Sequence, residues 1–496
     1  MKASSASSSP DRPPTSVVLY FQVHQPFRLR HFTFFDIGAG GGWFDDAENE
    51  RIVRRVAERC YRPTNAILLE QIERLEGRFR CAFSVSGTAL DQMERWAPEA
   101  LESFVKLART GCVEFLAETS HHSLASLVDA AEFDAQARAQ MQRVETLFGR
   151  RPTAFRNTEL VVSEPIARRV EELGFEVLLA EGADHLLGWR SPRHVYRPEG
   201  CERLKLLLRD YVLSDDVAFR FSNRDWPEWP LSAERFAAKL AAADARERYV
   251  GLFMDFETFG EHQWEETGIL AFLRALPAAA LAHSNLAFGT PTEVARELDP
   301  VARLSIPRPV SWADAERDLT AWLGNPMQAA AHEGLYALAA AVRAQGDAQL
   351  LQDWRRLSTS DHFYYMCTKW FSDGDVHKYF SPYATPHDAF ISFMNVLDDL
   401  ERRVRAPASA TPVRALPEAK AVSEPTQAPS PLRKARKSPS PKNAARKRAK
   451  SKPSSQNTRH AKSKRRAKKA SQSRTRARQP RARSHRAQKS RKKTSR

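Results

Sequence analysis

Short apolar runs alternate with helical stretches between Val17 and Phe288. This order is typical of buried parallel strands that are joined by helices. About seven such strands are expected, which favours a barrel of α/β units over a small open sheet. The expected strands cover 17–23, 80–85, 113–117, a segment ending at Glu159, 176–180, 204–208 and 249–254.

The expected strand at 249–254 ends in a polar segment that holds Asp255, Glu257, His262 and Trp264. In parallel α/β folds the functional site lies at the C-terminal ends of the strands. Asp255 and Glu257 are two residues apart, so in an extended chain both side chains point to the same side. We therefore expect this segment to deliver carboxylates into one cleft.

A second carboxylate, Glu159, ends the short extended segment that begins at Pro152, just before a helix expected from Ser163. Two carboxylates at equivalent strand ends suggest a facing pair. Glycoside hydrolysis requires such a pair, with one carboxyl as nucleophile or base and the other held protonated as the acid.

Five short blocks occur in order along the chain. They are His24-Gln25-Pro26, Gly111-Cys112-Val113-Glu114, the segment with Glu159, Asp255 followed by Phe259-Gly260, and Ser360-Asp361-His362. Together they resemble the sequence regions of glycoside hydrolase family 57, most closely its α-amylase-like branch. The resemblance implies an incomplete (β/α)7 TIM-like barrel that carries a retaining enzyme acting on α-1,4-glucans, as a hydrolase or a glucanotransferase.

The resemblance also implies roles for single residues. Glu159 matches the nucleophile of the family and Asp255 matches its acid/base. His24 and Glu114 match residues that line the sugar subsite, although Glu118 shares the face of Glu114 and is an alternative to it.

Four further residues are expected to bind substrate: Arg156, Glu257, Trp264 and Asp361. Arg156 stands three residues before Glu159, where many relatives have tryptophan, so we expect a charge or hydrogen bonds there in place of stacking. Glu257 competes with Asp255 for the acid role, but the spacing to Phe259-Gly260 favours Asp255. Trp264 offers an aromatic face to a sugar ring.

We expect four parts along the chain. Composition predicts a disordered N-terminus at 1–15 and a disordered tail at 405–496, and the resemblance implies a catalytic barrel at 16–305 and a helical domain at 306–404 that completes the cleft. Residues 406–496 contain 30 Lys and Arg against 2 acidic residues, a net charge of +28, so the preceding residues carry −11 of the total +17. The tail resembles those of linker histones and is expected to bind nucleic acid or another polyanion.

Neither a metal nor a cofactor is expected. His121, His122 and His262 are candidate ligands, but no Cys-x-x-Cys or His-x-x-x-His spacing accompanies them, and the chain has no glycine-rich phosphate loop. Two alternatives stay open: a metal-dependent polysaccharide deacetylase that uses His24 and Asp255, and a non-catalytic polyanion-binding protein on a barrel scaffold.

The expected location is the cytoplasm, without membrane association. The five cysteines are odd in number and scattered, which favours reduced thiols. The N-terminal segment does not fit a signal peptide, and no apolar run approaches the roughly 18 residues of a membrane span.

Overall fold

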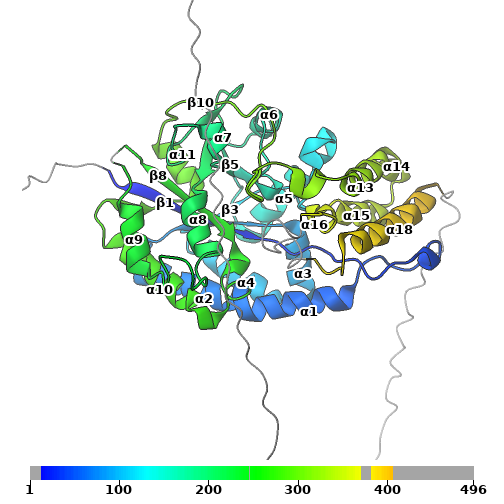
Figure 1. Ribbon diagram of the computed structural model, residues 1–496, viewed down its shortest axis with the longest axis horizontal. Helices are drawn as coiled ribbons and strands as arrows, with labels where there is room; N and C mark the ends of the chain where they lie inside the picture. The colour runs from blue at the N-terminus through cyan, green and yellow to red at the C-terminus, as the bar shows by residue number, and fades with distance from the viewer. Residues whose placement is uncertain (1–12, 245, 370–380, 406–496) are drawn as a thin grey trace, which may run out of the picture. The chain divides into compact units, whose positions relative to one another are not determined.

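A computed structural model describes residues 13–244, 246–369 and 381–405 (Figure 1). The predicted tail and most of the predicted N-terminal segment lie outside these ranges. Parallel strands form the centre, and most of their residues are buried on both faces, which explains their nearly continuous apolar sequences. The principal strands are β1 (Thr15–Val23), β2 (Cys81–Val85), β3 (Val113–Leu116), β4 (Ala154–Arg156), β5 (Val177–Glu181), β7 (Lys205–Arg209), β8 (Tyr249–Asp255) and β9 (Leu286–Phe288).

The strands form two parallel ladders. In the first, β1 lies between β2 and β8, and its first residues also pair with β9. Gln22 of β1 is in register with Asp255 of β8 and with Ser84 of β2, so polar side chains from three strands reach one edge. The second ladder has the order β4-β5-β7. Two short strands, β6 (Arg197–Pro198) and β10 (Arg303–Leu304), form a separate pair.

The expected incomplete barrel is found in part: its parallel strands are present, but strand pairing does not close them into a barrel. β3 and β4 meet through one isolated bridge between Ala117 and Phe155. Within the described residues no ladder joins β7 to β8, although the two strands are in contact. The architecture is therefore an α/β fold of parallel strands with an open seam.

Side chains occupy the seam between β7 and β8. The Tyr249 hydroxyl donates to the carbonyl of Leu208 at 2.9 Å, and Arg209 Nε donates to the carbonyl of Phe253 at 2.8 Å. These bonds use backbone acceptors that a ladder would require, so pairing stops here. A Cβ on Gly251 would lie 2.1 Å from the Tyr249 hydroxyl and 2.4 Å from the Leu208 carbonyl oxygen, so the seam requires glycine at this position.

Helices cover the strands and are delimited by local signals. For example, Asp129 accepts a hydrogen bond from the N–H of Glu132 at the start of α5, and Gly149 ends that helix in the left-handed conformation. The helices of this region are α1 (Asp46–Val56), α2 (Arg62–Arg74), α3 (Gly87–Trp96), α4 (Pro98–Arg109), α5 (Ala130–Phe148), α6 (Glu164–Glu172), α7 (Asp184–Leu187), α8 (Tyr211–Ala218), α9 (Ala233–Ala241), α10 (Ile269–Leu281) and α11 (Pro291–Glu297).

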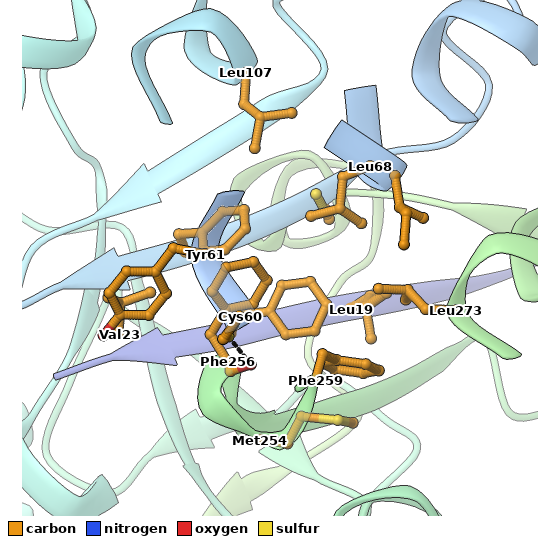
Figure 2. Packing of buried hydrophobic residues seen from close by; sticks show 14 of the residues in the cluster. Leu19, Val23, Cys60, Tyr61, Leu68, Leu107, Met254, Phe256, Phe259 and Leu273 are labelled. Carbon is orange, nitrogen blue, oxygen red and sulfur yellow. Dashed lines mark hydrogen bonds between the residues drawn. The ribbon is translucent and has the colours of Figure 1, made fainter. Parts of the chain in front are cut away.

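An aromatic core lies beneath the end of β8. Phe256 packs edge-on against Phe83, with ring centroids 4.9 Å apart, and stacks on Tyr61 at 6.1 Å. Figure 2 shows Phe256 and Tyr61 together with Cys60, whose thiol donates to the Phe256 carbonyl. The turn that follows Asp255 is thus held by buried aromatic packing, which fixes where the polar segment begins.

The C-terminal part of the described chain is helical, and its helices lie together at one side of the strands (Figure 1). Its core contains the buried side chains of Trp322, Trp354 and Phe363. An antiparallel bridge between Ser123 and Thr359 joins this region to the loop after β3. The helices are α12 (Thr320–Leu323), α13 (Pro326–Ala337), α14 (Ala339–Gln345), α15 (Ala348–Leu357), α16 (Ser360–Tyr364) and α18 (Pro386–Arg405). Among the described residues, no helix has the length and apolarity needed to cross a membrane.

Candidate active site

Two carboxylates lie at the C-terminal ends of strands from the two ladders. Asp255 is the last residue of β8, and Glu159 follows β4 in a 3-10 turn, Thr158–Leu160. The backbone of Glu159 is left-handed, with φ of +57°, which costs a non-glycine residue about 1–3 kcal/mol. Strain of this kind persists where the surrounding structure holds it, and it is concentrated at functional sites.

Three donors surround the Glu159 carboxylate. His122 Nε2 lies 3.3 Å from Oε1, the Ser360 hydroxyl donates to the same oxygen at 3.1 Å, and Trp312 Nε1 donates to Oε2 at 2.7 Å. Burial by itself would raise the pKa of Glu159, but the hydrogen bond and charge of His122 lower it below the usual value. Glu159 is therefore held as a carboxylate.

Asp255 has the opposite environment. Burial and the neighbouring charge of Glu159 raise the pKa of Asp255 to about 6, although Arg156, His122 and Arg209 oppose this rise. The pKa values of the two carboxyls are thus pushed apart, as they are in sites where one carboxyl acts as an acid and the other as an anion.

His122 connects two carboxylates. Its Nδ1 lies 2.7 Å from Glu118 Oε2, and its Nε2 faces Glu159. Burial lowers the pKa of His122, but Glu118 and Glu159 outweigh burial and raise it to about 9, so the ring is an imidazolium at neutral pH. The backbone of His122 is also left-handed, with φ of +50°.

His24 stacks on His122, with ring centroids 4.0 Å apart and planes at 19°. Its Nδ1 lies 2.8 Å from the Ser86 hydroxyl and its Nε2 lies 2.9 Å from Asp361 Oδ2. Burial and the adjacent His122 cation lower the pKa of His24, while His24 holds the pKa of Asp361 well below its usual range against the effect of burial. The structure therefore brings the predicted residues His24 and Asp361 to the site.

Arg156, at the end of β4, is fully buried. None of its three guanidinium nitrogens has a hydrogen-bond acceptor among the described residues. The ring of Trp312 covers the guanidinium at 4.7 Å. The predicted charge thus lies beside Glu159 and Asp255, and it interacts with them through its field, not through hydrogen bonds.

Glu257 is buried behind Asp255. The Tyr61 hydroxyl donates to its Oε1 at 2.5 Å, and Gln25 Nε2 donates to the same oxygen at 3.4 Å. Burial and the charge of Asp255 raise the pKa of Glu257 to about 8. The hydrogen-bond partners of Glu257 are thus side chains of the protein, and its expected contact with substrate stays a prediction.

Two predicted residues are not brought to this site. Glu114 lies near the start of β3, where its carboxylate accepts hydrogen bonds from the N–H and the hydroxyl of Thr292. Glu118 follows the end of β3, four residues further along the chain, which in an extended segment is a distance of about 13 Å. Glu118 is the one at the site. Trp264 is 61% exposed on the loop after β8, unlike the buried carboxyls of the site.

The sequence did not reveal Trp312, which is in an irregular segment between β10 and α12. The backbone N–H of Trp312 also donates to the backbone carbonyl of Glu159 at 3.2 Å. Arg317 holds this segment, since its Nη1 donates to the Trp312 carbonyl at 2.5 Å and lies 3.8 Å from Glu181 Oε2. Neither periodicity nor spacing identifies a tryptophan that reaches the site from a loop.

The deacetylase alternative requires converging metal ligands. Throughout the described ranges, no three or more His, Cys, Asp or Glu side chains form a group that could hold a metal ion. The histidines near the carboxylates are used otherwise, because both nitrogens of His24 and of His122 face hydrogen-bonding partners of the protein.

Paired carboxylates with separated pKa values, at the strand ends of a parallel α/β fold, are characteristic of a glycosidase. Residues 18–307 match the sequence profile of "Glycosyl hydrolase family 57". The chain is 37% identical over 406 residues to the "putative alpha-amylase" of Methanocaldococcus jannaschii, which covers 78% of this chain and 85% of that protein. The chain belongs to glycosyl hydrolase family 57, and the predicted family is confirmed.

Solved structures share the fold. A GH57-type branching enzyme from Pyrococcus horikoshii has a TM-score of 0.57 at 16% identity, over 78% of this chain and 88% of that enzyme. A 4-alpha-glucanotransferase from Thermococcus litoralis has a TM-score of 0.56 at 15% identity, over 71% of this chain and 56% of that enzyme, so this chain spans little more than half of its length. At these identities the likeness concerns the fold alone.

Proposed function

We propose that the protein is a retaining glycoside hydrolase or glucanotransferase that acts on α-1,4-linked glucans, with Glu159 as the nucleophile and Asp255 as the acid/base. The observation that carries the proposal is the opposed environment of the two carboxyls: donors surround Glu159 and lower its pKa, while burial and a neighbouring anion raise the pKa of Asp255. Family membership and the names of the relatives, an amylase, a branching enzyme and a glucanotransferase, support the substrate class.

In the first step Glu159 attacks the anomeric carbon while Asp255 gives its proton to the leaving glycosidic oxygen. The product is a glycosyl ester on Glu159 and a carboxylate at position 255. In the second step Asp255 takes a proton from the acceptor hydroxyl, which attacks the same carbon and releases Glu159. Two inversions give net retention.

The other residues of the site prepare these steps. The His122 imidazolium and Trp312 Nε1 keep Glu159 ionised and fixed in direction, which favours attack by one oxygen. Arg156 offsets the negative charge of the two carboxyls without a direct bond to either. His24 and Asp361 present a hydrogen-bonded pair at the rim, suited to sugar hydroxyls.

The acceptor in the second step decides between two activities. Water gives hydrolysis, and a glucan hydroxyl gives transfer or branching. Both outcomes use the same carboxylates, so the proposal covers both.

The test is product analysis on a maltooligosaccharide with wild-type protein and with Glu159→Gln, which keeps the shape and removes the nucleophile. Wild-type protein should give shorter or rearranged α-glucans with retained configuration, and the variant should lose turnover by several orders of magnitude. Circular dichroism checks that the variant is folded. Wild-type protein that leaves the substrate unchanged, or a folded variant with full activity, would contradict the proposal.

We further propose that the segment 406–496 binds nucleic acid or another polyanion. The observation behind this is its net charge of +28 beside a body of −11. Lysine and arginine neutralise phosphates and release counterions without reading base edges, as expected for a segment that resembles linker-histone tails.

A further inference from the structure

A second cavity, of about 400 Å³, lies at the other end of the strands from Glu159. It is lined by residues at the N-terminal ends of three neighbouring strands: Arg80 precedes β2, Glu114 is in β3, and Thr153 precedes β4. Thr292 and Arg296 of α11 complete the wall. Because the strands are parallel, this cavity and the carboxylate site occupy opposite edges of the sheet.

The cavity is basic although the body of the protein is acidic. Four arginines line it, Arg80, Arg150, Arg151 and Arg296, against two glutamates, Glu114 and Glu293. Residues 1–405 carry a net charge of −11, so four guanidiniums around one cavity are contrary to the general charge of this part of the chain. This concentration of donors suits an anionic ligand.

Both glutamates in the cavity wall are already bound. Glu114 accepts from the N–H of Thr292 at 3.0 Å and from its hydroxyl, and burial raises the pKa of Glu114. Glu293 pairs with Arg80 at 2.6 Å and accepts from the N–H of Thr290 at 2.9 Å. The acceptors of the wall are therefore occupied. Arg80 pairs with Glu293, Arg296 with Glu176 and Arg151 with Glu145, which leaves Arg150 as the wall arginine without an ion pair among the described residues.

Two guanidiniums meet beside Gly111. Arg80 Nη2 donates to the Gly111 carbonyl at 3.0 Å, and Arg150 Nη2 lies 3.6 Å from the position of a Cβ on Gly111. Within the described part of the chain, Arg150 forms no ion pair. Arg80 and Arg150 carry like charges at the same cavity wall, and Arg150 has no carboxylate partner there. An anion that binds between the two guanidiniums would stabilise both charges.

We propose that this cavity binds a small phosphate-bearing molecule, with the phosphate between Arg80 and Arg150. Guanidinium forks match phosphate oxygens in pairs, which suits them to a phosphate group. The volume is in the range of small-molecule sites. Phe148 and Pro152 supply an apolar wall for the remainder of a phosphate ester. The proposal does not depend on the activity proposed above.

The test is thermal unfolding of the full chain in millimolar orthophosphate, glucose 6-phosphate or adenosine monophosphate, with glucose and sodium chloride at matched ionic strength as references. A ligand that prefers the folded state raises the midpoint. We expect at least one phosphate compound to raise it above both references, and the compound with the largest rise identifies the source of the phosphate. Arg150→Ala with Arg151→Ala, both at exposed positions, should abolish the rise.

The matched control is Arg235→Ala with Arg246→Ala, two exposed arginines outside the cavity, which should keep the full rise. Segment 406–496 is identical in all variants, so anion binding there cancels from the comparison. Midpoints that no phosphate compound raises above the references would overturn the proposal. A rise that survives intact in the Arg150 and Arg151 variant would also overturn it.

Discussion

His122 Nε2 lies 3.3 Å from Glu159 Oε1, and both residues have left-handed backbones. Two strained residues that face each other indicate a geometry maintained for function. The charged groups that face this imidazole are Glu118 on the loop after β3, Glu159 after β4, and the pair of His24 and Asp361.

His122→Gln should therefore move the pH profile of kcat/KM to higher pH. His122 lowers the pKa of Glu159 and opposes the rise in the pKa of Asp255, so its loss raises both values. In wild-type protein the basic limb should fall above about pH 6, where Asp255 loses its proton. His332→Gln, a buried histidine of α13, is the matched control and should leave the profile in place. An unshifted profile in a folded His122→Gln protein would show that the contact is structural only.

Asp255→Asn should lose most turnover on maltooligosaccharides, because the amide cannot protonate the leaving oxygen. An α-maltosyl substrate with a nitrophenolate leaving group needs little protonation, so formation of the glycosyl ester should recover. The measurement is the initial burst of nitrophenolate. Glu159→Gln has no nucleophile and should give no burst with the same substrate. Bursts of equal size in both variants would reverse or remove the assigned roles.

Arg156→Met should reduce activity without reducing stability. The guanidinium is buried without a hydrogen-bond acceptor among the described residues, and replacing a buried charge by an apolar side chain of similar volume is often neutral or stabilising. The positive charge of Arg156 lowers the pKa values of Glu159 and Asp255. Its removal should therefore shift both limbs of the pH profile to higher pH.

The measurements for Arg156→Met are urea unfolding and the pH dependence of kcat/KM. Arg209→Met is an instructive comparison, because Arg209 is buried in ion pairs with Glu181 and Asp215 and its loss leaves those carboxylates unpaired. Arg209→Met should unfold at clearly lower urea, by about 3–5 kcal/mol of unfolding free energy. Similar destabilisation in Arg156→Met would mean that Arg156 holds the fold together.

The strand ends were predictable because an apolar run that stops at a carboxylate marks the edge of a parallel sheet. That logic located Glu159 and Asp255, and the family blocks added His24 and Asp361. The family blocks also suggested Glu114, with Glu118 on the same face as the alternative, and alternation along a strand could not decide between them because it defines a face but not an end of the strand. Trp312 and the side chains in the seam between β7 and β8 arise from tertiary contacts, which no local pattern encodes.

The final prediction concerns segment 406–496. Deleting it should leave glucan activity and thermal unfolding nearly unchanged, because the site and its supporting contacts lie in the described residues before it. Retention on duplex DNA should disappear, since the segment carries +28 and the rest −11. For the full chain, log K should fall by about 0.9 per phosphate neutralised for each tenfold rise in salt, with little sequence preference. A truncated protein that still binds DNA as tightly, or that loses activity, would show that the segment belongs to the working enzyme.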